Sequence, residues 1–182
     1  TASNDSILNC VINAPKPLAD PTWPYPAPTA AGINASSKLK GGNLVIKGNT
    51  IRRGEIGIYL VGLSPTASTK NNRIENNTFD SAVYRSIYVQ NASNLKIINN
   101  TIPVKTAFSI ATFGQGVAAI WMNNCDSAVE ISNNNITIQN NTGYVYGIFM
   151  SANNATATAR GKVMYNKVVA ITGLTMQPIP IS

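Results

Sequence analysis

Residues 74–79 read Ile-Glu-Asn-Asn-Thr-Phe, and residues 97–102 read Ile-Ile-Asn-Asn-Thr-Ile. Around these two copies, the same pattern of an apolar residue, Asn-Asn and a second apolar residue returns along the chain. Variants occupy residues 46–51, 131–136 and 163–168, and an earlier copy at 7–12 has Cys10 in place of the second Asn. A repeat of this kind predicts a solenoid, in which each unit packs only on its neighbours.

A second motif alternates with the first and consists of a small residue, Ile, any residue and an aliphatic residue. Its copies occupy residues 32–35, 57–60, 86–89, 119–122 and 147–150, and we expect a degenerate last copy at 169–172. The repeat length varies from 23 residues, between Asn77 and Asn100, to 39 residues, between Cys10 and Asn49. The segments are short, β-branched and separated by Asn, Gly and Pro, which favours stacked β-coils over helical repeats.

We therefore predict an all-β fold, a single-stranded parallel β-helix of about six coils that forms one domain over residues 1–182. Strand alternation places the apolar residues of the first motif inside the coil. The second Asn of each copy then lies at a bend, where Asn tolerates left-handed geometry and can bond the Asn one coil above. The members of this predicted internal ladder are Asn49, Asn77, Asn100, Asn134 and Asn166, with Cys10 at its end.

These Ile-x-Asn-Asn-Thr-Ile segments resemble those of the pectate-lyase-like superfamily of parallel β-helices, whose coils stack asparagines at one turn. The resemblance covers nearly all of the chain and implies a right-handed helix. The superfamily includes polysaccharide lyases, glycosidases, uronan epimerases and bacteriophage tailspikes, and this chain looks most like a segment of a tailspike or polysaccharide depolymerase. Because the motif consists of scaffold residues, it specifies the fold more closely than the activity.

Charge and cysteine content narrow the possible partners. The formal net charge is +7, and the basic residues are scattered, with only Arg52 and Arg53 adjacent. Such a diffuse positive field favours polyanions, so we expect a polysaccharide or lipopolysaccharide rather than a specific nucleic acid, for which no motif is present. No apolar stretch is long enough to span a bilayer. Cys10 and Cys125 fall several coils apart, beyond disulfide reach, so we expect two free thiols that are at least half-buried.

The outward position of the second motif is mostly aromatic and predicts a stripe along one face. Its residues are Asn34, Tyr59, Tyr88, Trp121 and Phe149, and beside them runs a row of small residues: Gly32, Gly57, Ser86, Ala119 and Gly147. Small residues leave room for a ligand near the sheet, and aromatic faces pack on sugar rings, so the stripe is a candidate glycan-binding groove. The alternative is that loops or a neighbouring subunit cover it.

Groups suited to catalysis are few. The chain has no His, which excludes His-based acid–base and nucleophilic catalysis, and it has no metal-ligand spacing, so we expect no metal or cofactor. Glycoside hydrolysis requires two facing carboxylates, and the best candidates are Glu55 and Asp80, in consecutive coils near Arg52, Arg53 and Arg85. The alternative is that these are solvated loop charges. Arg52 and Arg85 are also candidates for glycan or interface contacts.

Glu75 takes an outward place in the first motif, with Lys47 one coil below. We interpret it as a member of a surface ion-pair row with Lys47, Arg73 or Lys96. Related lyases hold Ca²⁺ with clustered aspartates, and this chain has no such cluster, which argues against a lyase site.

Two insertions, 13–31 and 103–118, interrupt the coils, and long loops on a solenoid commonly build its binding face. We expect the chain to be a fragment of a longer protein, or one whose ends are covered by partner subunits, with a homotrimer as the tailspike resemblance implies. The leading hypothesis is an extracellular or virion-borne β-helix that binds a surface polysaccharide, with its cleavage left open. The alternative is a non-catalytic structural or assembly domain of a virion appendage.

Overall fold

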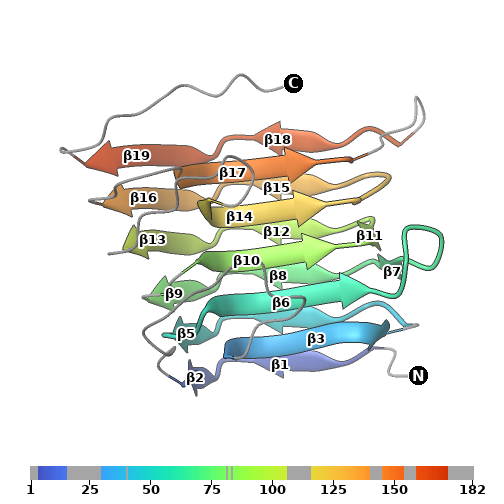
Figure 1. Ribbon diagram of the computed structural model, residues 1–182, viewed down its shortest axis with the longest axis horizontal. Coiled ribbons are helices and arrows are strands. Elements are labelled where there is room, and N and C mark those ends of the chain that lie inside the picture. The colour runs from blue at the N-terminus through green and yellow to red at the C-terminus, as the bar shows by residue number, and fades with distance from the viewer. Residues whose placement is uncertain are drawn as a thin grey trace.

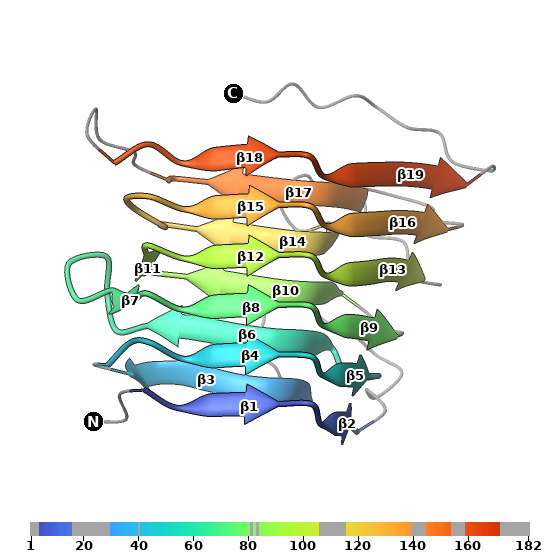
Figure 2. The same ribbon diagram turned by 180° about the vertical axis from the view of Figure 1, so that it is seen from behind.

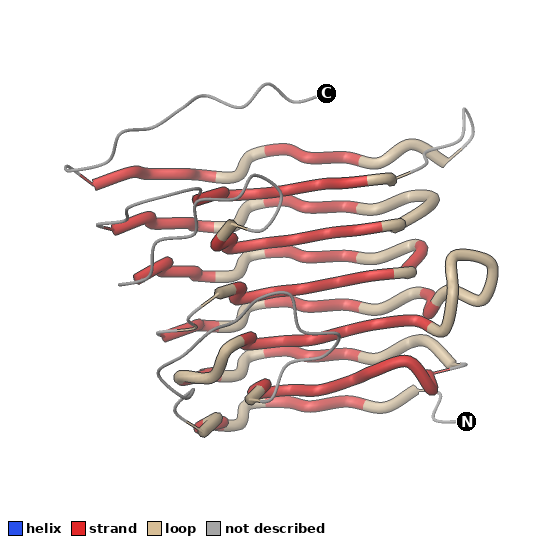
Figure 3. Tube along the Cα trace, viewed as in Figure 1, coloured by secondary structure: helices blue, strands red, loops and turns tan. Residues whose placement is uncertain are grey.

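The computed structural model describes residues 4–15, 30–39, 41–80, 82, 84–105, 116–139, 145–153 and 159–171. These residues form strands, turns and loops, with no helix among them (Figure 3). The strands stack as three parallel sheets along one axis, so that the first coil lies at one end of the stack and the last at the other (Figure 1). The predicted all-β parallel β-helix is confirmed.

Each complete coil gives one strand to each of the three sheets, and Figure 2 shows sheets A and B from behind. Sheet A contains β1 (Ser6–Leu8), β4 (Val45–Lys47), β8 (Arg73–Glu75), β12 (Lys96–Ile98), β15 (Glu130–Ser132) and β18 (Lys162–Met164). Sheet B contains β2 (Val11–Asn13), β5 (Thr50–Arg52), β9 (Thr78–Asp80), β13 (Thr101–Lys105), β16 (Asn135–Gln139) and β19 (Lys167–Ile171). Sheet C contains β3 (Ala31–Leu39), β6 (Ile56–Gly62), β10 (Arg85–Gln90), β14 (Val117–Asn123) and β17 (Val145–Ser151). A short fourth sheet pairs β7 (Thr69–Lys70) with β11 (Ala92–Ser93).

The number of coils is close to the predicted six. Sheets A and B have six strands each and sheet C has five, so the described residues form five complete coils and two strands of a sixth. The expected last copy of the second motif is wrong, because residues 169–171 continue β19 in sheet B, where Val169 is in register with Thr137. β-Branched residues are favoured in both sheets, so the motif alone did not distinguish a strand of sheet B from a strand of sheet C.

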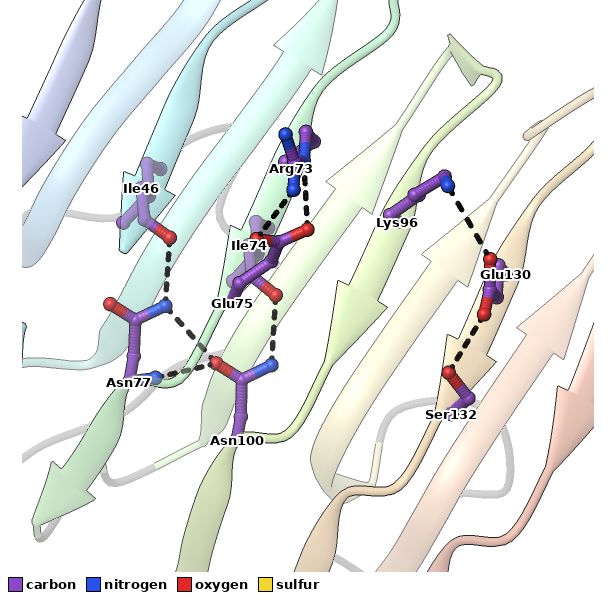
Figure 4. Close-up of polar contacts among 9 residues, drawn as sticks. All are labelled: Ile46, Arg73, Ile74, Glu75, Asn77, Lys96, Asn100, Glu130 and Ser132. Atoms are coloured by element: carbon purple, nitrogen blue, oxygen red, sulfur yellow. Dashed lines mark hydrogen bonds and ion pairs between the residues drawn. The ribbon is translucent and has the colours of Figure 1, made fainter. Parts of the chain in front are cut away.

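The asparagine ladder at the bend between sheets A and B is confirmed (Figure 4). Each Nδ2 donates to the Oδ1 of the next rung, at 3.0 Å from Asn49 to Asn77, from Asn77 to Asn100 and from Asn100 to Asn134, and at 2.9 Å from Asn134 to Asn166. Each Nδ2 also donates to a main-chain oxygen of the preceding coil, and each Oδ1 also accepts the main-chain N–H of the preceding rung. Because the side-chain polar atoms of a middle rung are all bonded, the ladder fixes coil stacking without leaving an unsatisfied buried group.

The left-handed residue at this bend is the one before each rung, not the rung itself as we expected. These residues have φ between 53° and 68°: Asn9, Gly48, Asn76, Asn99, Asn133 and Tyr165. Short polar side chains adopt this geometry most readily, which explains the Asn-Asn pairs. A second column at the bend before sheet A, Asn43, Asn71 and Asn94, is also left-handed and forms its own exposed side-chain ladder. Two kinds of bend therefore account for much of the Asn content.

Columns of aliphatic side chains fill the coil interior. In sheet A, the register aligns Ile7, Ile46, Ile74, Ile97, Ile131 and Val163. The four middle members are fully buried and belong to one continuous core cluster. This burial is the main driving force for stacking, at about 1.5–3 kcal/mol for each such side chain.

Most of the two expected insertions lies outside the described residues. At their edges, β2 reaches Asn13, β13 continues through Pro103 to Lys105, and β14 begins at Val117. Thr101 donates its N–H toward β9, and the N–H that Pro103 lacks would point the same way. On the β9 side, the described pairing of β13 is confined to Thr101. The N–H that Pro103 lacks would point to that side, so the proline interrupts no hydrogen bond between β13 and β16.

Candidate functional site

Four aromatic side chains form a column on the outer face of sheet C, which we call the aromatic column: Tyr59, Tyr88, Trp121 and Phe149. Asn34 is in register with Tyr59 at the start of this column. The Tyr59 and Tyr88 rings stack at 5.2 Å between centroids, and the Trp121 and Phe149 rings stack at 3.9 Å. The column therefore consists of two stacked pairs.

Arg85 connects these two pairs. It lies on the same face in a neighbouring column, in register with Ile56 and Ala118. Its guanidinium carbon is 3.8 Å from the centroid of Trp121 and 5.1 Å from that of Tyr88, which places the cation over both rings. Arg85 is only 3% exposed, and burial lowers its pKa to about 10, with the Tyr88 and Tyr59 hydroxyls opposing this shift. The group remains protonated at neutral pH, so a buried positive charge lies within the aromatic column.

The two tyrosines remain neutral phenols at physiological pH. Burial raises the pKa of Tyr59 and of Tyr88, and in both cases Arg85 opposes the shift. The Tyr88 hydroxyl donates to Gln90 Oε1 at 2.8 Å. At the far end of the column, the Tyr146 ring meets the Trp121 ring edge-on, with centroids 5.8 Å apart. The column is thus held by both ring packing and a polar contact at its border.

Exposure divides this face into a covered part and an open part. Tyr59 is 8% exposed and Trp121 is 6% exposed, whereas Tyr88 and Phe149 are only half-buried. Along the open border runs a second in-register column, which we call the amide column: Gln90, Asn123 and Ser151. All three are half-buried. The accessible surface therefore combines aromatic edges with amide and hydroxyl groups.

The row of small residues does not line a groove, contrary to our expectation. A Cβ added to Gly57 would lie 2.8 Å from Cδ1 of Phe79, and one added to Gly32 would lie 2.7 Å from Cγ2 of Ile51. Ala119 belongs to the main core cluster and is fully buried. These positions face the interior, because the strand alternation shifts at the start of each sheet C strand. Gly32 and Gly57 lack a side chain because sheet B side chains and main-chain oxygens of the next coil occupy the space where a Cβ would lie.

The candidate acid pair lies at the corner between sheets B and C in consecutive coils. Asp80 ends β9 and is in register with Arg52, and both side chains are exposed. Glu55 directly precedes β6 and is 8% exposed, and its main-chain oxygen accepts the N–H groups of Tyr84 and Arg85. The two carboxylates therefore occupy neighbouring corners, but they differ in access to solvent.

A comparison with protein families identifies the fold group. Residues 2–136 match the family described as the right handed beta helix region. The chain belongs to this right-handed β-helix family. No curated protein and no solved structure matches the chain. Membership establishes a parallel β-helix and specifies no reaction or ligand.

The exposed face of sheet A in this right-handed β-helix has a row of ion pairs (Figure 4). Arg73 binds Glu75 through two contacts, Nε to Oε1 at 2.7 Å and Nη2 to Oε2 at 2.9 Å. Lys96 Nζ lies 3.7 Å from Glu130, which also accepts a bond from the Ser132 hydroxyl at 3.0 Å. The interpretation of Glu75 as an ion-pair residue is confirmed. Its side chain is held by Arg73.

The thiols differ from each other. Cys10 and Cys125 are both free, as expected, but Cys10 is exposed rather than half-buried because it lies in the first coil. Burial raises the pKa of Cys125 to about 11, which keeps it a neutral thiol.

Within the described ranges, no group of three or more His, Cys, Asp or Glu side chains could hold a metal ion. The same ranges contain no helix long and apolar enough to cross a membrane.

Sequence reasoning missed the contact of Arg85 with Trp121 and the whole amide column. The amide column had a sequence signal, because its members lie two residues after the aromatic position of the second motif, where alternation returns to the outer face. The contact of Arg85 with Trp121 had no such sequence signal, because it depends on how the long arginine side chain lies across two neighbouring coils.

Proposed function

We propose that this chain is a polysaccharide-binding β-helix that holds an extended glycan along the open border of sheet C. The observation that carries the proposal is the pairing of half-buried Tyr88 and Phe149 with the amide column. Aromatic faces pack on the apolar faces of sugar rings, and amide and hydroxyl groups bind sugar hydroxyls. Successive coils repeat at about 4.8 Å, so a linear glycan aligned with the stack would meet the same kinds of group at each level.

An acidic glycan of a cell surface, such as a lipopolysaccharide, suits the formal net charge of +7. We further propose an extracellular or virion location, as in tailspike or depolymerase proteins, and assembly as a homotrimer or with neighbouring domains. The proposal covers binding, and cleavage by Glu55 and Asp80 is a separate hypothesis. It is weakened by the low exposure of Glu55, since a catalytic acid must reach the glycosidic oxygen.

The test compares two aromatic substitutions. Phe149→Ala removes a half-buried ring from the border, whereas Tyr165→Ala removes a ring that is 81% exposed at the bend between β18 and β19. On an array of bacterial and plant polysaccharides, we expect Phe149→Ala to weaken binding at least about tenfold. Tyr165→Ala should bind as the unchanged protein does. Equal effects of the two substitutions, or no binding to any glycan, would contradict the proposal.

A structural or assembly role is the second candidate, and the half-buried rings of Tyr88 and Phe149 are the part of the aromatic column that a protein partner would contact. In that role the aromatic column packs against protein. Light scattering of the Phe149→Ala variant separates the candidates: dissociation of an oligomer without any glycan affinity supports the assembly role. Release of reducing ends from a bound polysaccharide would instead support an enzyme, and Asp80→Asn should then abolish that release.

A further inference from the structure

The amide column differs from the two asparagine ladders of this chain, because its amides do not bond each other. In the ladders, amides one coil apart are joined by hydrogen bonds of 2.6–3.1 Å. Gln90 and Asn123 are likewise in register one coil apart. Among the described residues, however, the Gln90 amide bonds only Tyr88, and the side chains of Asn123 and Ser151 make no hydrogen bond. The amide column therefore keeps its hydrogen-bonding groups open.

Tyr88 accounts for the open amide of Gln90. Its hydroxyl donates to Gln90 Oε1 at 2.8 Å, two residues away on the same strand. This bond occupies the amide oxygen and turns the amide along β10 instead of toward Asn123 on β14. The two Nε2 hydrogens remain as donors, because a primary amide donates only through its nitrogen. Tyr88 thus positions a pair of donors at the half-buried border of sheet C.

The groups around these donors are electropositive as well. Stacking leaves ring edges of Tyr88 and Phe149 accessible at the border, and a ring edge is the positive end of the aromatic quadrupole. Arg85 adds a buried positive charge, with its guanidinium carbon 5.1 Å from the Tyr88 ring centroid. The border therefore favours a ligand group that presents an acceptor oxygen.

A neutral carbonyl group fits this border better than a carboxylate or a hydroxyl. The members of the aromatic and amide columns are uncharged, and Arg85 beside them is only 3% exposed, so a carboxylate would leave water without a direct ionic partner. An acetamido group, as in N-acetylated sugars, has a neutral acceptor oxygen, and its N–H matches the acceptor Asn123 Oδ1. Its methyl group also adds apolar contact with the ring edges, which a hydroxyl does not.

We propose that the amide column is a subsite for acetamido groups, so that the bound glycan contains N-acetylated sugars. Gln90 Nε2 donates to the acetamido carbonyl oxygen, and Tyr88 is the positioning residue that holds the Gln90 amide. This inference rests on the proposed function, because it names the sugar bound at the same border of sheet C. Acidic units elsewhere in such a polymer are still attracted by the net charge of +7.

The test uses two matched pairs of monosaccharides: N-acetylglucosamine against glucose, and N-acetylgalactosamine against galactose. Within each pair, an acetamido group replaces one hydroxyl. The side-chain amide signals of Asn123 in two-dimensional NMR report the binding of each sugar. We expect the acetamido sugar of at least one pair to have a dissociation constant at least about tenfold lower than its partner and than glucuronic acid, which carries a carboxylate.

Two variants separate the donor from the residue that positions it. Gln90→Glu replaces the donors by oxygens with little change of shape, and Tyr88→Phe removes the hydroxyl but keeps the ring. Each should reduce the preference for the acetamido sugar to less than about threefold, with little change in the affinity for the hydroxyl sugar. Gln139→Glu, at a half-buried Gln on the outer face of sheet B, is the control for the added charge and should keep the full preference. Thermal melting confirms that each variant is folded.

Equal dissociation constants within both pairs, or a preference for glucuronic acid, would overturn the inference and leave the proposed function standing. The same holds if polysaccharides bind on the array while no monosaccharide shifts the Asn123 signals. A preference that survives Gln90→Glu would also overturn it, because the acetamido group would then be bound elsewhere. If no monosaccharide and no polysaccharide binds, the proposed function fails too, so the two failures are distinguishable.

Discussion

Replacing Asn100 by Ala removes the middle rung of the ladder, and its effect follows from four side-chain hydrogen bonds. Asn100 Nδ2 donates to Ile74 O at 2.9 Å and to Asn134 Oδ1 at 3.0 Å. Its Oδ1 accepts the main-chain N–H and the Nδ2 of Asn77, both at 3.0 Å. The residue is fully buried, so water does not replace these partners without opening the coil.

Three groups lose a partner in the Asn100→Ala variant: the Asn77 main-chain N–H, one hydrogen of the Asn77 amide, and Ile74 O. Asn134 Oδ1 keeps the main-chain N–H of residue 100, at 3.0 Å. Each unsatisfied buried group costs about 1–3 kcal/mol, and partial relaxation lowers the sum, so we expect a loss of about 3–5 kcal/mol. For a chain of this size, that corresponds to a melting temperature lower by about 6–20 °C.

Urea unfolding followed by circular dichroism measures this loss as a shift of the midpoint at constant slope. Asn135→Ala is the matched control, because Asn135 is an exposed amide that is outward-facing on β16, and its substitution should change stability by less than about 0.5 kcal/mol. Asn166→Ala, at the partly exposed last rung, should fall between the two. A loss below about 1 kcal/mol for Asn100→Ala, or equal losses for Asn100 and Asn135, would refute the role assigned to the ladder.

Two further predictions concern the interior. Gly57→Ala should destabilise the fold by about 1–3 kcal/mol because its Cβ would overlap Ser86 O and the Phe79 ring, whereas Gly161→Ala, whose Cβ would lie 3.6 Å from Val129 O, should be close to neutral in the same urea assay. If Gly57→Ala is neutral, the inward orientation of the small-residue row is wrong. Burial raises the pKa of Cys125 from 9.0 to about 11, so its contribution to stability is complete below pH 9 and is lost as the pH rises to 11. The loss over this window is about 2 kcal/mol, and Cys125→Ala should flatten the decline in urea titrations between those pH values under reducing conditions; an unchanged decline would contradict this.

Much of the scaffold could be predicted because each coil repeats the same local requirements. Ile-x-Asn-Asn-Thr-Ile specifies an inward residue, a left-handed bend and a ladder amide within six positions, and the register of Ile74, Ile97 and Ile131 follows from aligning the copies. The orientation of Gly57 could not be predicted, since it depends on a shift of alternation at the start of β6 and on the ring of Phe79 from another sheet.

The candidate site was only partly visible in the sequence. Alternation was enough to place Tyr88 and Phe149 in one outward column with Trp121, because strand pairing repeats every coil. The exposed fraction of each ring was not predictable from the sequence, because it depends on which other side chains and loops cover that coil. The pairing of Glu75 with Arg73, two residues away on one strand face, was accessible from alternation alone.

The sequence by itself therefore determined the stacked β-coils and the asparagine ladder, because these depend on contacts between identical positions of successive repeats. The tertiary structure alone decided which outward residues are accessible and how Arg85 joins two pairs of rings. The physical reason is the range of the interactions. Alternation and bend geometry act within a few residues, whereas burial and cation–π contacts depend on neighbours that belong to other coils.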